Sequence, residues 1–92
     1  MIRSIRHRGL KRFFEHDDRR KLRPDLVYKI ALLLSRLDAA VTIDDMNVQS
    51  FGLHRLSGDL KGFWSVTVSR NWRIVFRFEE GDAFDVDFID YH

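Results

Sequence analysis

The chain of 92 residues carries 16 Lys and Arg side chains against 14 Asp and Glu, a net charge of +2. A chain this short forms one domain around a single modest core. It contains no cysteine, which excludes disulfides and thiolate metal sites. No apolar run approaches the roughly 20 residues that a membrane span needs, and no signal peptide is visible. We therefore expect one cytoplasmic domain, residues 1–92, without a membrane partner.

The charges are distributed unevenly along the chain. Residues 1–36 hold eleven basic against four acidic side chains, a net of +7, and residues 37–92 hold five against ten, a net of −5. A basic half beside an acidic half indicates an anionic partner for one face. Two solvated faces that neutralise each other would explain the same pattern.

The first half of the chain predicts two helices. Met1–Arg6 alternates imperfectly and predicts a short edge strand. His7–His16 predicts a short helix because its apolar side chains recur at i, i+3 and i+4. After a charged connector, Asp17–Arg23, a longer helix begins at Pro24, a residue that suits a first helical turn. Its apolar stripe consists of Leu26, Ile30, Leu33 and Leu37.

The second half predicts an antiparallel sheet. Apolar and polar side chains alternate over Trp64–Ser69, Trp72–Phe78 and Ala83–His92, which is typical of strands with one covered and one open face. Phe51–Leu56 predicts a further short strand, after a loop over Ala39–Ser50. The helices are the natural cover for the apolar face. We expect an α+β fold with two N-terminal helices packed on one face of a small antiparallel sheet.

The register of the last two strands depends on the loop between them. A two-residue loop would pair Phe78 with Ala83 and mix the two faces, so we predict a three-residue loop, Glu80-Gly81-Asp82. On the covered face this register pairs Phe78 with Phe84, Phe76 with Val86 and Ile74 with Phe88. On the open face it pairs Arg77 with Asp85 and Arg73 with Ile89.

The open face of this sheet carries side chains that suit RNA. Arg73 and Arg77 project from it and Tyr91 lies at its edge, a set able to bind a phosphate and a stacked base. For Arg77, an ion pair with Asp85 or Asp87 on a solvated face is the simpler expectation. Arg73 has no carboxylate opposite and is the better phosphate ligand.

Groups able to transfer protons gather at the end of the chain. Asp90, Tyr91 and His92 follow the last strand, and His54 lies in an earlier one. With Arg73 they supply a base, an acid and a cation, as cleavage of RNA through its own 2′-hydroxyl requires. Strict alternation places Tyr91 on the open face but Asp90 and His92 on the covered one. The three converge only at a strand end.

No metal or cofactor is expected. The His, Asp and Glu residues show no pair with metal-ligand spacing on a helix. The remaining histidines, His7 and His16, are expected at the surface.

Segments throughout the chain carry a family resemblance. They are Leu53-His-Arg-Leu-Ser-Gly58, Gly62-Phe-Trp-Ser-Val-Thr-Val68, Trp72-Arg-Ile-Val-Phe76, Gly81-Asp-Ala83 and Asp90-Tyr-His92, with Met1-Ile-Arg-Ser4, Gly9-Leu10 and Phe13-Phe14 near the start. Together these segments resemble the HigB toxins of the RelE/ParE superfamily of bacterial toxin–antitoxin systems. Asp17–Arg23 and Val41–Ser50 match least.

The resemblance implies a RelE-like, microbial RNase-like fold and a metal-independent endoribonuclease that cleaves mRNA in the A site of the 70S ribosome, inhibiting translation and growth. It implies a HigA-type helix-turn-helix antitoxin as partner, with operator DNA contacted only through that antitoxin. The implied active site comprises His54, Arg73, Asp90, Tyr91 and His92. The basic side chains expected to contact RNA are Arg6, Arg8, Lys11, Arg12, Arg55, Lys61 and Arg77. Ser57 stands where a relative has a lysine.

Two other functions suit the same fold, because one scaffold hosts several functions. A ParE-like poison of DNA gyrase should lack the terminal acid–base set that this chain carries. In a non-catalytic RNA-binding module, the terminal His and Tyr would take no part in chemistry.

Overall fold

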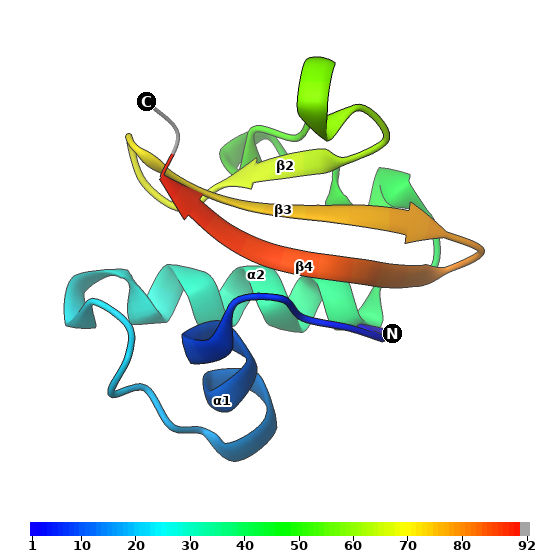
Figure 1. The fold of residues 1–92 in the computed structure, drawn as a ribbon. Helices are drawn as coiled ribbons and strands as arrows, with labels where there is room; N and C mark the ends of the chain where they lie inside the picture. Colours follow the sequence, from blue (N-terminus) through cyan, green and yellow to red (C-terminus); the bar gives the residue numbers. More distant parts are fainter. Residues whose placement is uncertain (91–92) are drawn as a thin grey trace.

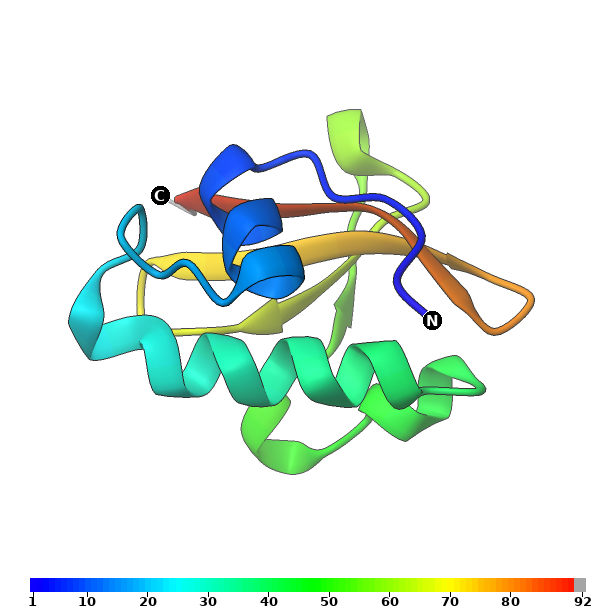
Figure 2. The same ribbon diagram turned by 90° about the horizontal axis from the view of Figure 1, so that it is seen from below.

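The computed structural model describes residues 1–90, which form two α-helices and a four-stranded antiparallel sheet (Figure 1). The helices are α1 (Arg8–His16) and α2 (Val27–Ala39), and the strands are β1 (His54–Arg55), β2 (Trp64–Thr67), β3 (Trp72–Glu79) and β4 (Asp82–Asp90). The strands pair in chain order. In both views the helices lie on the same side of the sheet (Figures 1 and 2). The α+β class predicted from the sequence is confirmed.

Helix α2 forms where the apolar stripe predicts it. A 3-10 turn, Pro24–Leu26, leads directly into the helix. The buried side chains of α2 are Val27, Ile30, Leu33, Leu34 and Leu37. They share one hydrophobic core with Ile74, Phe76 and Val86 of the sheet, which are fully buried. Full burial of such a side chain stabilises the fold by about 1.5–3 kcal/mol. Within residues 1–90, no helix is long and apolar enough to cross a membrane.

Helix α1 is capped by a histidine. The Nδ1 atom of His7 accepts a hydrogen bond from the backbone N–H of Leu10 at 3.0 Å. The imidazole ring also packs edge-on against Phe88, with the ring centroids 5.6 Å apart. His7 is half-buried, and its capping role was not predicted because histidine is not among the residues that usually signal an N-cap. His16 is exposed, as predicted.

The N-terminal segment, Met1–Arg6, lies along the outer edge of β4. It forms two isolated parallel bridges, Ile2 with Ala83 and Ile5 with Val86, and the N–H of Ile2 donates to Asp38 Oδ1 of α2 at 2.8 Å. The predicted edge strand does not form. The two isoleucines are three positions apart, a spacing that cannot place both on one face of a regular strand. The segment nevertheless covers the exposed edge of the sheet.

The β3–β4 hairpin differs from its predicted register in its outer half. Its turn has two residues, Glu80 and Gly81, both with positive φ (50° and 82°), as in tight hairpins. Phe78 therefore pairs with Ala83 instead of Phe84. A β-bulge between Val75 and Arg77, with Asp85 at φ 53°, then shifts the pairing by one residue. Beyond the bulge, Ile74 pairs with Phe88 and Arg73 with Ile89, as predicted.

Strand β1 is much shorter than the predicted Phe51–Leu56. Phe51 ends a 3-10 turn and is buried against α2, beneath Lys29 and Arg36. Gly52 follows with φ 59°, and a Cβ on it would lie 2.9 Å from Thr67 Oγ1. This left-handed glycine prevents an extended strand from starting before His54.

Candidate active site

His54 and Arg73 lie on the same face of the sheet. One row of paired residues crosses the four strands as His54, Ser65, Val75 and Asp87, and the next row on that face is Thr67, Arg73 and Ile89. Both rows share a face because successive side chains of a strand alternate. Strand spacing and rise place the Cα atoms of His54 and Arg73 ~12 Å apart.

This open face is only partly solvated. Val75 and Phe63 are buried, and the Ser65 side chain is buried between them and its neighbours in the row. The guanidinium of Arg6 lies 5.6 Å from the centre of the Phe63 ring. The sequence pattern predicted a polar face, but the β1–β2 loop and the N-terminal segment cover its middle. At the β1 edge of the face, His54 is exposed.

His54 is exposed and oriented by its neighbour's backbone. Its Nδ1 atom lies 2.9 Å from the carbonyl oxygen of Leu53. A carbonyl only accepts hydrogen bonds, so Nδ1 carries the hydrogen in this contact. In the neutral ring, Nε2 is then the acceptor. This orientation leaves a ring nitrogen able to take a proton from a substrate.

The Arg73 guanidinium turns toward the β2–β3 loop. Its Nη1 atom donates to the carbonyl oxygens of Ser69 (2.7 Å), Arg70 (3.2 Å) and Trp72 (3.2 Å). These carbonyls hold the guanidinium in one orientation at the end of the sheet. A positive charge held in place before substrate binds can stabilise developing negative charge without reorganising.

Asp90 lies at the same end of the sheet, on the alternate face. It pairs with Trp72, one position beyond the pair of Arg73 and Ile89. On the sheet face that carries Asp90, the Trp72 ring stacks on the Phe88 ring, with the ring centroids 4.6 Å apart. The structure therefore brings Asp90 and Arg73 to one strand end without placing them on one face. Tyr91 and His92 lie outside the described residues, so their convergence with Asp90 stays a prediction.

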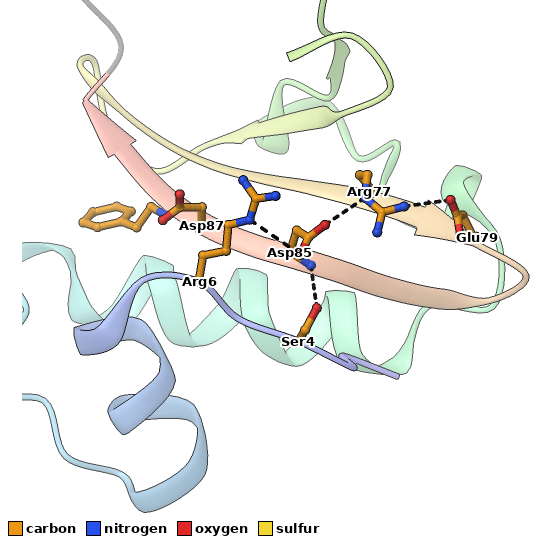
Figure 3. Close-up of polar contacts among 7 residues, drawn as sticks. Ser4, Arg6, Arg77, Glu79, Asp85 and Asp87 are labelled. Atoms are coloured by element: carbon orange, nitrogen blue, oxygen red, sulfur yellow. Dashed lines mark hydrogen bonds and ion pairs between the residues drawn. The ribbon is translucent and has the colours of Figure 1, made fainter. Parts of the chain in front are cut away.

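Two of the predicted RNA-binding arginines are tied into an ion-pair network (Figure 3). Arg77 donates from Nε to Asp85 Oδ2 at 2.9 Å and from Nη1 to Glu79 Oε1 at 2.8 Å. Arg6 approaches Asp85 Oδ1 at 3.5 Å, and the Asp85 N–H donates to the Ser4 hydroxyl at 2.8 Å. The ion pair expected for Arg77 is thus present, and the network fastens the N-terminal segment to the bulge.

The same network shifts proton affinities. The hydrogen bond from Arg77 holds the pKa of Asp85 below its usual value, with further help from the charge of Arg6 against the effect of burial. The Asp85 carboxylate in turn raises the pKa of Arg77. Both groups therefore remain charged at neutral pH.

The other predicted RNA-binding side chains lie on two surfaces. Arg8, Lys11 and Arg12 are exposed on α1. Arg55 lies over the Trp64 ring, 5.1 Å from its centre, and Lys61 is exposed in the β1–β2 loop. Within that loop a hollow of about 240 Å³ is lined by Arg55, Leu56, Ser57, Asp59 and Leu60. Residues 1–90 contain no group of three or more His, Asp or Glu side chains placed to hold a metal ion.

Comparison with known proteins decides the family. Residues 3–92 match the HigB-like toxin family, described as the RelE-like toxin of the type II toxin–antitoxin system HigB. The chain belongs to this family. It is a HigB-like toxin of the type II class, and the resemblance drawn from the sequence motifs is confirmed.

Named relatives agree with this assignment, and solved structures share the fold. Endoribonuclease HigB of Proteus vulgaris is 42% identical over 92 residues, which cover the whole of both chains. Toxin HigB-1 of Vibrio cholerae serotype O1 is 29% identical, covering 100% of this chain and 98% of that protein. The YoeB–YefM toxin–antitoxin complex of Staphylococcus aureus has a chain with a TM-score of 0.63 at 19% identity, covering 100% of this toxin and 95% of that chain. A YafQ mutant from E. coli has a TM-score of 0.60 at 16% identity, with 98% and 91% covered. At these identities the structures support the RelE-like fold alone.

Proposed function

We propose that this HigB-like toxin is an endoribonuclease that cleaves messenger RNA in the A site of the 70S ribosome and so stops translation and growth. One observation carries the proposal: an exposed His54 and a braced Arg73 share a sheet face near the strand end that reaches Asp90. The 42% identical relative is named an endoribonuclease, which supports the reaction class.

The proposed reaction needs no metal or cofactor. A base removes the proton of the ribose 2′-hydroxyl, whose oxygen attacks the adjacent phosphorus while the bond to the 5′-oxygen breaks. An acid protonates that leaving oxygen, and the products are a 2′,3′-cyclic phosphate and a 5′-hydroxyl. His54 and His92 share the acid and base roles, and Asp90 orients a histidine or takes the 2′-proton. Tyr91 hydrogen-bonds the phosphate or stacks on a base.

Arg73 supplies the positive charge in this scheme. Negative charge grows on the phosphoryl oxygens as the 2′-oxygen attacks, and a guanidinium already fixed by the carbonyls of Ser69, Arg70 and Trp72 stabilises it. Arg8, Lys11, Arg12, Arg55 and Lys61 are exposed and would attract RNA. Arg6 and Arg77 are engaged with Asp85, so their contribution is smaller.

The openness of the site supports the proposed dependence on the ribosome. His54 is exposed and separated from Arg73, so the toxin alone does little to align the 2′-oxygen, phosphorus and leaving oxygen. Alignment of reacting groups can lower a barrier by about 7–11 kcal/mol. A message held in the ribosomal A site would be aligned before the toxin acts on it.

A HigA-type helix-turn-helix antitoxin is the proposed partner in the cytoplasm, and operator DNA would be reached only through it. Membership of a type II toxin–antitoxin family supports a protein antitoxin. The complex of YoeB with YefM supports direct binding between toxins of this fold and their antitoxins.

Expression in bacteria tests the function. Wild-type toxin should arrest growth and yield cleaved mRNA, and co-expressed antitoxin should restore growth. A chain ending at Asp90 keeps every buried side chain described above but lacks two proposed catalytic groups, so it should be harmless while still binding the antitoxin. Growth arrest by this shortened chain without mRNA cleavage would reject the nuclease and favour gyrase poisoning.

A further inference from the structure

The connector between α1 and α2, residues 17–23, contains a carboxylate held by two guanidinium groups. Arg20 donates from Nε to Asp18 Oδ1 and from Nη2 to Oδ2, both at 2.9 Å. Arg12 donates from Nε to Oδ2 at 3.1 Å, and its Nη2 forms an ion pair with the same oxygen at 2.9 Å. The Asp18 side chain is only 13% exposed, whereas that of Arg12 is 48% and that of Arg20 80% exposed. Asp18 thus acts as an internal brace for two outward-facing cations.

The brace is firm. The hydrogen bonds from Arg20, with a further one from Arg12, hold the pKa of the Asp18 carboxyl far below its ordinary range. The backbone N–H of Arg20 also donates to Asp18 Oδ1 at 3.1 Å. Close by, the Cβ of Lys21 lies where a side chain on Gly9 would begin, 2.8 Å from a Cβ placed there, and Leu22 is buried in the core. The connector therefore contacts α1 at two places, through Asp18 and through Lys21.

A hollow of about 310 Å³ opens beside this brace. It is lined by Arg12, Asp18, Arg20 and Lys21, three cations against one anion, a net charge of +2. In their contacts with Asp18 both arginines use Nε and Nη2, so the Nη1 group of each is left to donate to another acceptor. Paired donors on planar guanidinium groups suit the oxygens of a phosphate.

The lining also indicates which partner the hollow fits. It has no aromatic ring on which a base could stack and no apolar side chain that could anchor a protein. The site can therefore bind a phosphate but cannot recognise a base. In both views the connector lies toward the end of the molecule where β4 finishes (Figures 1 and 2). The molecule measures 30 × 28 × 25 Å, so one RNA can extend from the connector to the candidate active site.

We propose that Arg12, Arg20 and Lys21, braced by Asp18, form a binding site for a backbone phosphate of RNA. The inference rests on the proposed function and adds to it a contact outside the sheet. Asp18 is a positioning residue here, because it touches the arginines and not the phosphate. The phosphate comes either from the message or from ribosomal RNA, and the two sources are separated below.

Two arginines of the same connector provide a matched test. Arg20→Ala and Arg23→Ala each remove one positive charge. Arg23 pairs with Asp25 through Nε (3.2 Å) and Nη2 (2.9 Å), much as Arg20 pairs with Asp18, but it does not line the hollow. Affinity should be measured by fluorescence anisotropy with a short single-stranded RNA and by pelleting with programmed 70S ribosomes. Arg20→Ala should weaken binding about tenfold and lower the salt slope by about one, and Arg23→Ala should change both much less.

Asp18→Asn distinguishes a braced site from simple charge attraction by the sign of its effect. The substitution makes the connector more positive, so charge attraction alone predicts tighter RNA binding. The braced site predicts weaker binding, because an amide cannot hold both guanidinium groups. Thermal unfolding of each variant should be checked first, and binding measured at a temperature where all are folded.

The outcomes separate this inference from the proposed function. Weakening with both probes by Arg20→Ala assigns the phosphate to the message, and weakening with ribosomes alone assigns it to ribosomal RNA. Equal effects of Arg20→Ala and Arg23→Ala, or tighter binding by Asp18→Asn, would overturn the site. A wild-type toxin that binds RNA through Arg20 but never cleaves it would overturn the proposed function and leave this site standing.

Discussion

His54 and Arg73 occupy adjacent rows of the same sheet face, because their partners Ser65 and Thr67 are two residues apart on β2. Only a paired β1 produces this relationship, although β1 has just two residues. The Gly52 turn sets where that pairing begins. Although β1 is short, it joins His54, the proposed proton-transfer group, to the sheet that carries Arg73.

Replacing His54 should affect chemistry without affecting the fold. His54→Ala removes an exposed side chain, so unfolding should be unchanged, whereas RNA cleavage should fall by about 10²–10⁴-fold if the imidazole transfers a proton. His16→Ala, also at an exposed histidine, is the matched control and should retain full activity. Single-turnover cleavage measures the effect, and equal rates for the two variants would remove His54 from the mechanism.

Phe76 should be among the most costly residues to truncate. Its side chain is fully buried in the core shared with α2, so Phe76→Ala leaves a large cavity and should lower the free energy of unfolding by about 3–5 kcal/mol. Phe14, which is 37% exposed, provides a control that should lose much less. Urea unfolding compares the two, and similar losses would contradict the described core.

The Arg77–Asp85 pair should make stability depend on acid pH. Its hydrogen bond lowers the pKa of Asp85 in the folded chain, relative to about 3.9 when unfolded. The resulting stabilisation is complete above about pH 4 and is lost as the pH falls through the lower, folded pKa. Asp85→Asn should therefore reduce the unfolding temperature at pH 7 and flatten its fall in acid. Asp44→Asn, at an exposed carboxylate, is the control, and parallel pH curves for Asp85→Asn and wild type would contradict the assigned role of the pair.

Adding a positive charge at the hollow in the β1–β2 loop should strengthen binding to the ribosome. Ser57 is exposed and lines the hollow that also contains Arg55. Ser57→Lys should increase affinity for ribosomes and make it more salt-dependent, by a slope of about one. Gln49→Lys, on another exposed turn, adds the same charge elsewhere. If both variants gain equally, the effect is net charge and not a contact at this hollow.

Periodicity explains which parts of the fold were predictable. The apolar stripe of α2 and the alternation of apolar and polar side chains in β2, β3 and β4 reflect which side chains are buried. Those elements can therefore be predicted from the sequence. The bulge does not, since it depends on Asp85 adopting φ 53° with no glycine to signal it. The N-terminal segment depends on contacts with β4 that are distant in sequence. Tertiary contacts, and not local sequence patterns, determine both the bulge and the path of the N-terminal segment.

The residue types of the candidate site could be predicted from the sequence, but their arrangement in space could be predicted only in part. Pairing across β1 and β2 brings His54 to the face of Arg73, and alternation keeps Asp90 off it, as the sequence pattern indicated. The cap formed by His7 and the brace formed by Asp18 were missed. Both contacts are local, from Leu10 to His7 and from Arg20 to Asp18, but histidine is not among the residues that usually signal an N-cap.

The rate of cleavage with and without the ribosome tests the central claim most directly. Purified wild-type toxin should be given one end-labelled message either free in solution or bound in the A site of programmed 70S ribosomes, with His54→Ala as the inactive reference. Cleavage should be far faster on ribosomes, because they supply the alignment that an exposed His54 and a separate Arg73 do not. Equal rates on free and ribosome-bound message would contradict it and would show that the toxin aligns RNA by itself.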